Sequence, residues 1–177
     1  HMLSWLAVDG TAAIVEFPGV LYRGAAEAKI RQYLVENNYV DAVIQLPPDL
    51  FFGTTIGTCI IVLKKSKQDN SVLFVDASKQ FVREGNKNKL SAENQEMILE
   101  TLAKRANVDH VAALVSAEAI RENVFNLSVS SYVEAEDTRE EVDIVELNAR
   151  IKEIVERQAV LRASINEIVA DLEGGAR

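Results

Sequence analysis

The sequence contains one cysteine, Cys59, and two histidines, of which His1 together with Met2 looks like the remnant of an expression vector. A single cysteine excludes a disulfide framework and a metal cluster built on thiolates. Because Cys59 lies in an apolar run at residues 58–63, we expect it to be buried in a strand. His110 is interpreted as a surface turn residue. Nucleophilic catalysis by a Ser-His-Asp or Cys-His set is therefore nearly excluded, and no spacing of His, Cys, Asp or Glu predicts a metal site.

Long apolar runs and a surplus of basic residues are also lacking. No run reaches the roughly 18 consecutive apolar residues of a membrane-spanning helix, and no leader with a cleavage site is visible. We therefore expect a cytoplasmic protein with no membrane contact. The net charge is −8, which argues against a free-standing nucleic-acid binder because phosphate contact needs excess Lys and Arg on at least one face. That argument weakens if the chain is only part of something larger.

The chain has 177 residues, of which 48% are hydrophobic and 26% are charged. This composition is typical of one ordinary domain, or of one domain plus an appendage. Charge divides the chain, because residues 134–177 hold 12 acidic and 6 basic side chains while residues 1–133 hold 15 and 13. In the larger part, short and uniformly apolar runs predict strands covered on both faces, and hence an α/β sheet with helices above and below it. These runs are residues 12–15, 42–46, 58–63 and 72–75.

Two helices and a loop are predicted among these strands. Residues 24–36 carry apolar side chains near helical spacing and are interpreted as a crossover helix. Residues 91–105 open with Ser91 and, three residues later, Asn94, which predicts a helix with a serine cap. Residues 85–89 are polar and are predicted to form a loop.

The strongest periodic pattern lies near the end of the chain, where apolar residues alternate at spacings of 3 and 4 with Gln158 as a polar interruption. These are a and d positions of a heptad. Val155 and Val169 fall at e positions, which favours a bundle of several helices over a two-stranded coiled coil. We predict that this apolar stripe is a partner interface. Its members are Ile144, Leu147, Ile151, Ile154, Leu161, Ile165, Ile168 and Leu172.

The same segment carries signals for both ends of a helix. Thr138 and Glu141 form a capping box, and glycines at positions 174 and 175 supply a stop, so one helix is predicted over residues 138–173. At about 1.5 Å per residue it would be roughly 50 Å long, more than the width of a small domain. Such a helix must protrude or lie along a partner. The alternative is that it packs on its own domain.

The segment at residues 46–55, LPPDLFFGTT, is unusual. Pro47 and Pro48 directly follow a predicted strand and fix the backbone as it leaves the sheet. Phe51 and Phe52 then stand where α/β sheets place their ligands, at strand ends. The alternative is a structural loop whose phenylalanines plug the core. A phosphate-cradling loop is not indicated, because no lysine follows the glycines of this segment and the chain continues into a strand.

Five blocks of the sequence carry a resemblance that is specific when they are taken together. They are residues 10–24 (GTAAIVEFPGVLYRG), 29–34 (KIRQYL), 43–64 (VIQLPPDLFFGTTIGTCIIVLK), 72–78 (VLFVDAS) and 126–133 (NLSVSSYV). In this order and spacing they resemble the modification (methyltransferase) subunit of type I restriction-modification systems, an N6-adenine DNA methyltransferase. Gly57 stands where the family usually has proline, and Glu16 and Phe17 replace more typical residues; neither change threatens the assignment.

The resemblance covers about residues 3–135 and implies the C-terminal part of a Rossmann-like S-adenosylmethionine-dependent methyltransferase sheet, followed by a helical region with the long helix. The last three strands of that sheet would be residues 11–16, 42–46 and 58–64, with the final strand antiparallel after a hairpin-like return. The family binds S-adenosylmethionine at a glycine-rich turn and catalyses transfer at an Asn-Pro-Pro-Phe loop, and neither motif is present.

The Leu-Pro-Pro-Asp sequence at residues 46–49 does not replace that loop. Leu46 offers no side-chain acceptor for the amino group of adenine, and Asp49 offers no stacking face. No catalytic residue is therefore assigned in this chain, and we expect the fragment to be inactive alone.

The resemblance does imply a role for the phenylalanines. In related adenine methyltransferases the loop between the last two strands contributes an aromatic that stacks on the flipped adenine. Phe51 occupies that place, with Phe52 as the second choice. Stacking holds the base by its π-face and leaves the amino group free.

It also implies partners for the long helix. The full-length subunit would act on double-stranded DNA with a specificity subunit and a restriction subunit, and the heptad helix would dock on the specificity subunit. Expressed alone, the chain is expected to self-associate through residues 139–172. A different class of function remains open, namely a non-enzymatic assembly module that acts only through this helix.

Overall fold

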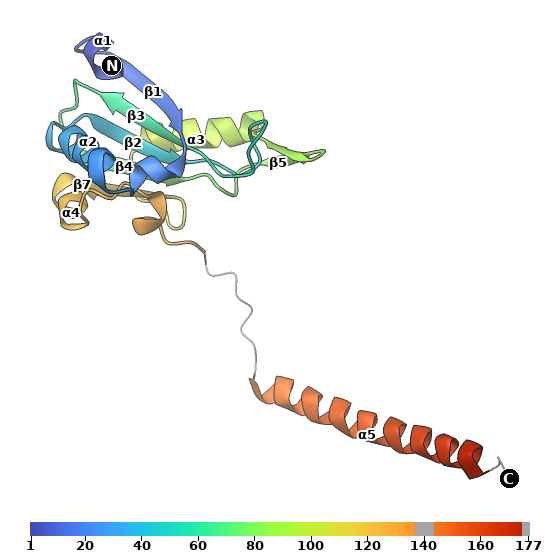
Figure 1. Cartoon of the computed structure of the whole chain (residues 1–177). Helices are drawn as coiled ribbons and strands as arrows, with labels where there is room; N and C mark the ends of the chain where they lie inside the picture. Colours follow the sequence, from blue (N-terminus) through green and yellow to red (C-terminus); the bar gives the residue numbers. More distant parts are fainter. Residues whose placement is uncertain (137–143, 175–177) are drawn as a thin grey trace. The chain divides into compact units, whose positions relative to one another are not determined.

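A computed structural model describes residues 1–136 and 144–174 of the chain (Figure 1). The chain divides into two compact units, His1–Glu136 and Asp137–Arg177. The first unit is a mixed α/β fold, and the described part of the second is one long helix.

A five-stranded sheet forms the centre of the first unit, with the strand order β1-β3-β2-β4-β7. β3 is antiparallel to β1 and β2, β2 is parallel to β4, and β7 is antiparallel to β4. The four predicted strands are confirmed, with bounds that differ by at most two residues. The predicted antiparallel direction of the strand at residues 58–64 is confirmed as well, since this strand is β3. The bounds are β1 (Thr11–Glu16), β2 (Val40–Gln45), β3 (Cys59–Lys64), β4 (Ser71–Asp76) and β7 (Ala112–Ser116).

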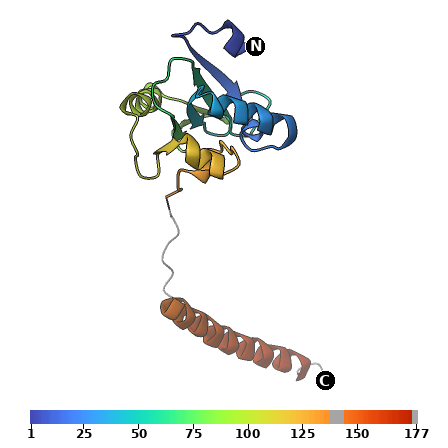
Figure 2. The same cartoon turned by 90° about the vertical axis from the view of Figure 1, so that its left-hand side faces the viewer.

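Helices cover both faces of the sheet, as the fully apolar strands predicted (Figure 2). On one face α2 (Ala25–Glu36), α4 (Ala117–Glu122) and the short 3₁₀ helices η1 (Pro18–Leu21) and η2 (Val129–Ser131) pack on Val43 and Phe74. On the other face α3 (Ala92–Lys104) packs through Ile98 on Ile44, Leu73 and Val75. Because successive residues of β2 and β4 point to opposite faces, both strands are buried almost throughout.

The predicted helices at residues 24–36 and 91–105 are confirmed as α2 and α3. In α3 the Ser91 hydroxyl accepts a hydrogen bond from the backbone N–H of Asn94 over 3.2 Å, while the Asn94 side chain accepts one from the backbone N–H of Ser91 over 3.0 Å. This reciprocal pair satisfies two donors at the helix start. A further short helix, α1 (Met2–Trp5), precedes β1.

The expectation of a polar loop at residues 85–89 is wrong. The chain there forms a hairpin of β5 (Val82–Glu84) and β6 (Lys87–Lys89), which projects from the end of the sheet (Figure 1). The two-residue turn between them places Gly85 at a φ of 61°, a conformation that favours glycine. The hairpin was missed because its residues are mostly polar, so the alternation that marks a half-buried strand is absent.

The second unit contains α5 (Ile144–Gly174), a helix of 31 residues and about 46 Å. The predicted capping pair Thr138 and Glu141 and the second glycine of the stop lie outside the described residues. A single helix cannot cover its own apolar stripe, and the a and d side chains are between 47% and 71% exposed. None of the described helices is long and apolar enough to cross a membrane.

Candidate functional site

The loop at residues 46–58, which joins β2 to β3, lies at one edge of the sheet. β1, β2 and β4 run in the same direction, because β3 is antiparallel to β1 and β2 while β2 is parallel to β4. Their carboxyl ends, the start of the loop among them, therefore share this edge. Open α/β sheets bind ligands at such an edge.

The base of the loop is tightly closed. The backbone N–H of Leu46 donates to the carbonyl of Thr58 over 2.8 Å, which extends the β2–β3 ladder by one pair. Gly57 lies so close to this strand that a Cβ atom on it would stand 3.1 Å from the Leu46 carbonyl oxygen. A side chain here would have to displace the backbone of Leu46, so glycine suits this position.

Phe51 and Phe52 are on the surface of the described chain. Phe52 is 97% exposed and Phe51 is 42% exposed, so neither phenylalanine plugs the core. Both line a groove of about 270 Å³ whose other walls come from the end of β1 and from the loop itself. The groove is lined by Val15, Glu16, Phe17, Phe51, Phe52, Thr54 and Thr58.

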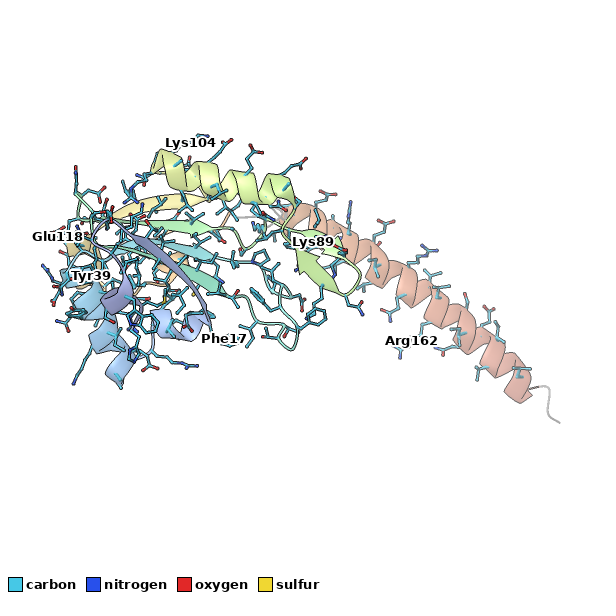
Figure 3. All side chains as sticks on the ribbon, turned by 90° about the horizontal axis from the view of Figure 1, so that it is seen from above. Phe17, Tyr39, Lys89, Lys104, Glu118 and Arg162 are labelled. Atoms are coloured by element: carbon cyan, nitrogen blue, oxygen red, sulfur yellow. The ribbon has the colours of Figure 1, made fainter. Side chains whose placement is uncertain are left out.

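Among the groove residues that were not predicted are Phe17 and Thr58. Phe17, which is 53% exposed, brings a third aromatic ring from the segment after β1 to the same groove, and Figure 3 labels it beyond the end of that strand. Thr58 is nearly buried, and its hydroxyl has no hydrogen-bond partner within the described residues. Buried hydroxyl groups are usually hydrogen-bonded, so this one is free to donate to a group in the groove. The position of Phe17 directly after a strand, at the edge where the loop starts, is the signal that could have found it.

Cys59 directly follows the loop and is fully buried, as predicted. Burial raises the pKa of its thiol to about 11, and the nearby negative charge of Glu16 adds to this effect, while a hydrogen bond to the Glu16 carbonyl opposes it. Since the thiolate is the reactive form, Cys59 is an inert part of the core and not a nucleophile. His110 is confirmed as an exposed turn residue.

The groove is suited to holding a flat apolar group. Its aromatic walls offer π-faces, and it contains no pair of groups arranged as nucleophile and base. In the part of the chain that the structure describes, no group of three or more His, Cys, Asp or Glu side chains could hold a metal ion. The fold and the groove together define part of an α/β protein with an aromatic groove at the carboxyl edge of its sheet.

Comparison with known proteins identifies the family. The profile of the N-6 DNA methylase family matches residues 1–141, which is most of the chain. The chain therefore belongs to the N-6 DNA methylase family.

Similar curated proteins support this assignment, since they are methylase subunits of type I restriction enzymes. The chain is 45% identical over 174 residues to the type I restriction enzyme MpnII methylase subunit of Mycoplasma pneumoniae, covering 98% of this chain and 32% of that protein. It is 35% identical over 167 residues to the MjaVIII methylase subunit of Methanocaldococcus jannaschii, covering 89% of this chain and 29% of that one. The chain thus spans about a third of the length of these relatives.

A solved structure shows the same fold. The methyltransferase subunit of a type I restriction-modification system from Streptococcus thermophilus superposes with a TM-score of 0.69 at 43% identity, covering 71% of this chain and 27% of that one. The EcoKI M protein, at 16% identity and a TM-score of 0.55, shows the fold alone.

Proposed function

We propose that this chain is the C-terminal part of the methyltransferase subunit of a type I restriction-modification complex, and that the whole subunit transfers a methyl group from S-adenosylmethionine to the N6 amino group of adenine in DNA. The family match and the names of the relatives support this proposal. The observation that carries it is the aromatic groove at the carboxyl edge of the sheet, which suits a planar base.

In this proposal β1, β2 and β3 are the last three strands of a Rossmann-like sheet. β1 is an edge strand within the described residues, with Val15 49% exposed. An apolar edge of this kind is suited to pairing with another strand. The portion of the relatives that this chain does not span would supply that strand and the rest of the sheet.

S-adenosylmethionine would supply the methyl group, but the residues of this chain do not fit its binding site. The sequence contains neither a glycine-rich turn after a first strand nor an Asn-Pro-Pro-Phe motif. No residue here is therefore assigned to hold the cofactor or to catalyse the transfer, and we expect the chain alone to be inactive.

The role proposed for this chain is to hold the target base. Phe51 would stack on the adenine flipped out of the duplex, with Phe52 as the second choice. The groove supports this, because Phe51 and Phe17 come from different segments of the chain, are both exposed, and line the same groove. Stacking is sequence-tolerant and leaves the amino group of the base free for transfer.

Substitution of Phe51 in the full-length subunit, assembled with its specificity subunit, tests this role. Loss of one base-stacking contact corresponds to about 1–3 kcal/mol, so Phe51→Ala should lower the methylation rate about 10-fold to 100-fold. The affinity for S-adenosylmethionine should stay within twofold. Phe81→Ala is a matched control, since Phe81 is a similarly exposed aromatic that does not line the groove. An equal loss of cofactor binding would contradict the stacking role.

A second function, assembly of the complex, is favoured by α5. Its exposed apolar stripe at a, d and e positions is a surface on which a partner helix could pack. We propose that it docks on the specificity subunit and so brings the methyltransferase to DNA and to the restriction subunit. If Phe51→Ala leaves methylation unchanged while substitutions on α5 abolish assembly, the chain is an assembly module only.

A further inference from the structure

The hairpin β5–β6, which the sequence did not predict, holds the loop that carries Phe51 and Phe52. Asn88 donates from its side-chain amide to the carbonyl of Pro48 over 2.8 Å and from its backbone N–H to the carbonyl of Asp49 over 3.1 Å. Arg83 forms an ion pair with Asp49 over 3.5 Å. These contacts fix the first part of the loop, where the chain has just left β2.

Lys87 holds the part of the loop that bears the aromatic rings. Its ammonium group donates to the carbonyl of Phe51 over 3.1 Å and to the carbonyl of Thr54 over 3.3 Å. These two carbonyls stand at the ends of a tight turn whose third residue, Gly53, has a φ of 80°. One cation therefore bridges both ends of the turn that presents Phe52 and orients Phe51.

This support comes from one source. Within residues 1–136 and 144–174, the hydrogen bonds that reach residues 48–54 from outside the loop all come from Lys87 and Asn88. Asn88 is itself buried, and its side-chain oxygen accepts a hydrogen bond from Arg83 over 3.0 Å, so its amide is held in one orientation. The loop is thus positioned by an element that lies more than 30 positions later in the sequence.

Direct binding of DNA phosphates is less well supported as the task of this hairpin. Arg83 and Lys87 face Asp49, and Lys89 pairs with Glu84 over 2.9 Å. Each of these three cations therefore has an acidic neighbour. The charge on the hairpin is largely compensated, whereas its hydrogen bonds converge on the loop.

We propose that Lys87, supported by Asn88, is a positioning residue that holds Phe51 in the geometry required to stack on the flipped adenine. The inference rests on the proposed function of Phe51. Without the two bonds from Lys87 the turn at residues 51–54 would sample other conformations, so the correct one would be populated for only a fraction of the time. The rate of methyl transfer would fall to that fraction of its original value, while the binding of cofactor and duplex would be unaffected.

The first experiment tests the clamp in this chain alone, by hydrogen exchange. Lys87→Met keeps the aliphatic stem but removes the ammonium donor. We expect the amides of Ile56 and Asn88, which donate to the Thr54 hydroxyl and to the Asp49 carbonyl within the loop, to exchange at least fivefold faster in Lys87→Met than in the unsubstituted chain. Lys89→Met, on the same strand but paired only with exposed Glu84 among the described residues, should leave them unchanged. Equal exchange in both variants would overturn the inference.

The second experiment tests the consequence in the full-length subunit assembled with its specificity subunit and DNA. Lys87→Met should lower the single-turnover methylation rate about tenfold with the dissociation constants for S-adenosylmethionine and DNA within twofold of the parent. Lys87→Arg, which retains a charged donor, should recover much of the rate, and Lys89→Met should match the parent. A loss caused by weaker DNA affinity, and shared by Lys89→Met, would overturn the inference in favour of phosphate binding.

A double-mutant cycle separates this inference from the proposed role of Phe51. If Lys87 acts through Phe51, then Lys87→Met should lower the rate no further in a Phe51→Ala background. Additive losses would overturn the positioning role while leaving the stacking role intact. If Phe51→Ala has no effect, the proposed stacking role is wrong and this inference falls with it, whereas a faster exchange of the loop would still establish the clamp itself.

Discussion

The guanidinium of Arg31, in α2, donates a hydrogen bond from Nε to the backbone carbonyl of Phe125, 94 positions later in the chain, over 2.9 Å. Its Nη1 donates to the carbonyl of Val20 over a further 2.9 Å. Arg31 is only 5% exposed, so these two bonds tie α2 to the segments around η1 and α4 inside the fold. The contact uses two donors of one planar guanidinium group, which the single ammonium group of lysine cannot reproduce.

Replacing Arg31 should therefore destabilise the first unit. Arg31→Met leaves two partly buried carbonyls without donors, and we expect the free energy of unfolding to fall by about 2–3 kcal/mol. Arg31→Lys should recover only part of this loss, since one ammonium cannot easily serve two carbonyls on different segments. Urea denaturation followed by circular dichroism measures the effect. Lys29→Met, an exposed change on the same helix, is the control and should stay within about 0.5 kcal/mol of the parent.

Cys59 should make the stability of the fold depend on alkaline pH. Its pKa is about 11 in the folded chain against 9.0 ordinarily, because burial disfavours the thiolate. As the pH rises, the thiol therefore loses its proton in the unfolded chain before it does so in the folded chain. The contribution of the protonated thiol to the free energy of unfolding is fully present below pH 9 and is lost as the pH rises towards 11. The loss is on the order of 2 kcal/mol.

Comparison with Cys59→Ala isolates this contribution from those of lysine and tyrosine side chains that titrate in the same range. The free energy of unfolding, measured by urea denaturation at several pH values from 7 upward, should fall more steeply for the parent than for Cys59→Ala. Parallel curves would show that the thiol does not couple to folding.

The stripe on α5 should drive self-association when the chain is expressed alone. Light scattering is expected to show a dimer or larger species, because an exposed stripe of a and d side chains gains free energy by packing on a second copy. Ile154→Glu places a charge in the middle of the stripe and should shift the chain to a monomer.

The control for this change is Ala163→Glu, which adds the same charge at an f position, on the opposite side of the helix. It should leave the oligomeric state unchanged. A monomer that is the same for the parent and for Ile154→Glu would contradict the prediction. Loss of association in both variants would show that net charge matters and not the stripe.

The central strands were predictable because each is covered on both faces, which leaves a short run of apolar residues such as residues 42–46 or 72–75. The strand β7 was not predicted, although residues 111–115 are apolar. Its first two residues are alanines, which have little β-propensity, so the run gives no clear preference for strand over helix. The edge position of β7 is set by its pairing with β4, which is a tertiary contact.

Some residues of the candidate site could likewise be predicted from the sequence, and others could not. Phe51 and Phe52 could be selected from the sequence, since an aromatic pair after two prolines and a strand end is a local pattern. Phe17 has one such local signal, its position directly after a strand. Thr58, Lys87 and Asn88 have none, because each matters only through neighbours that lie elsewhere in the chain. The sequence around a single lysine in a polar segment is the same whether that lysine is solvated or donates hydrogen bonds to a distant loop.

The sequence by itself determined that the strands β2 and β4 are buried, and that Cys59 lies in the core while His110 lies in a surface turn. It also predicted a helix with one apolar stripe over residues 138–173, of which the structure describes residues 144–174. These properties depend on residues that are near each other in the chain, through periodicity, capping and composition. Only the tertiary structure decided that β3 lies between β1 and β2, that Phe17 faces the same groove as Phe51, and that Lys87 holds the loop carrying it. These relationships join positions tens of residues apart, and what brings them together is the burial of two apolar faces on one sheet, which no local pattern encodes.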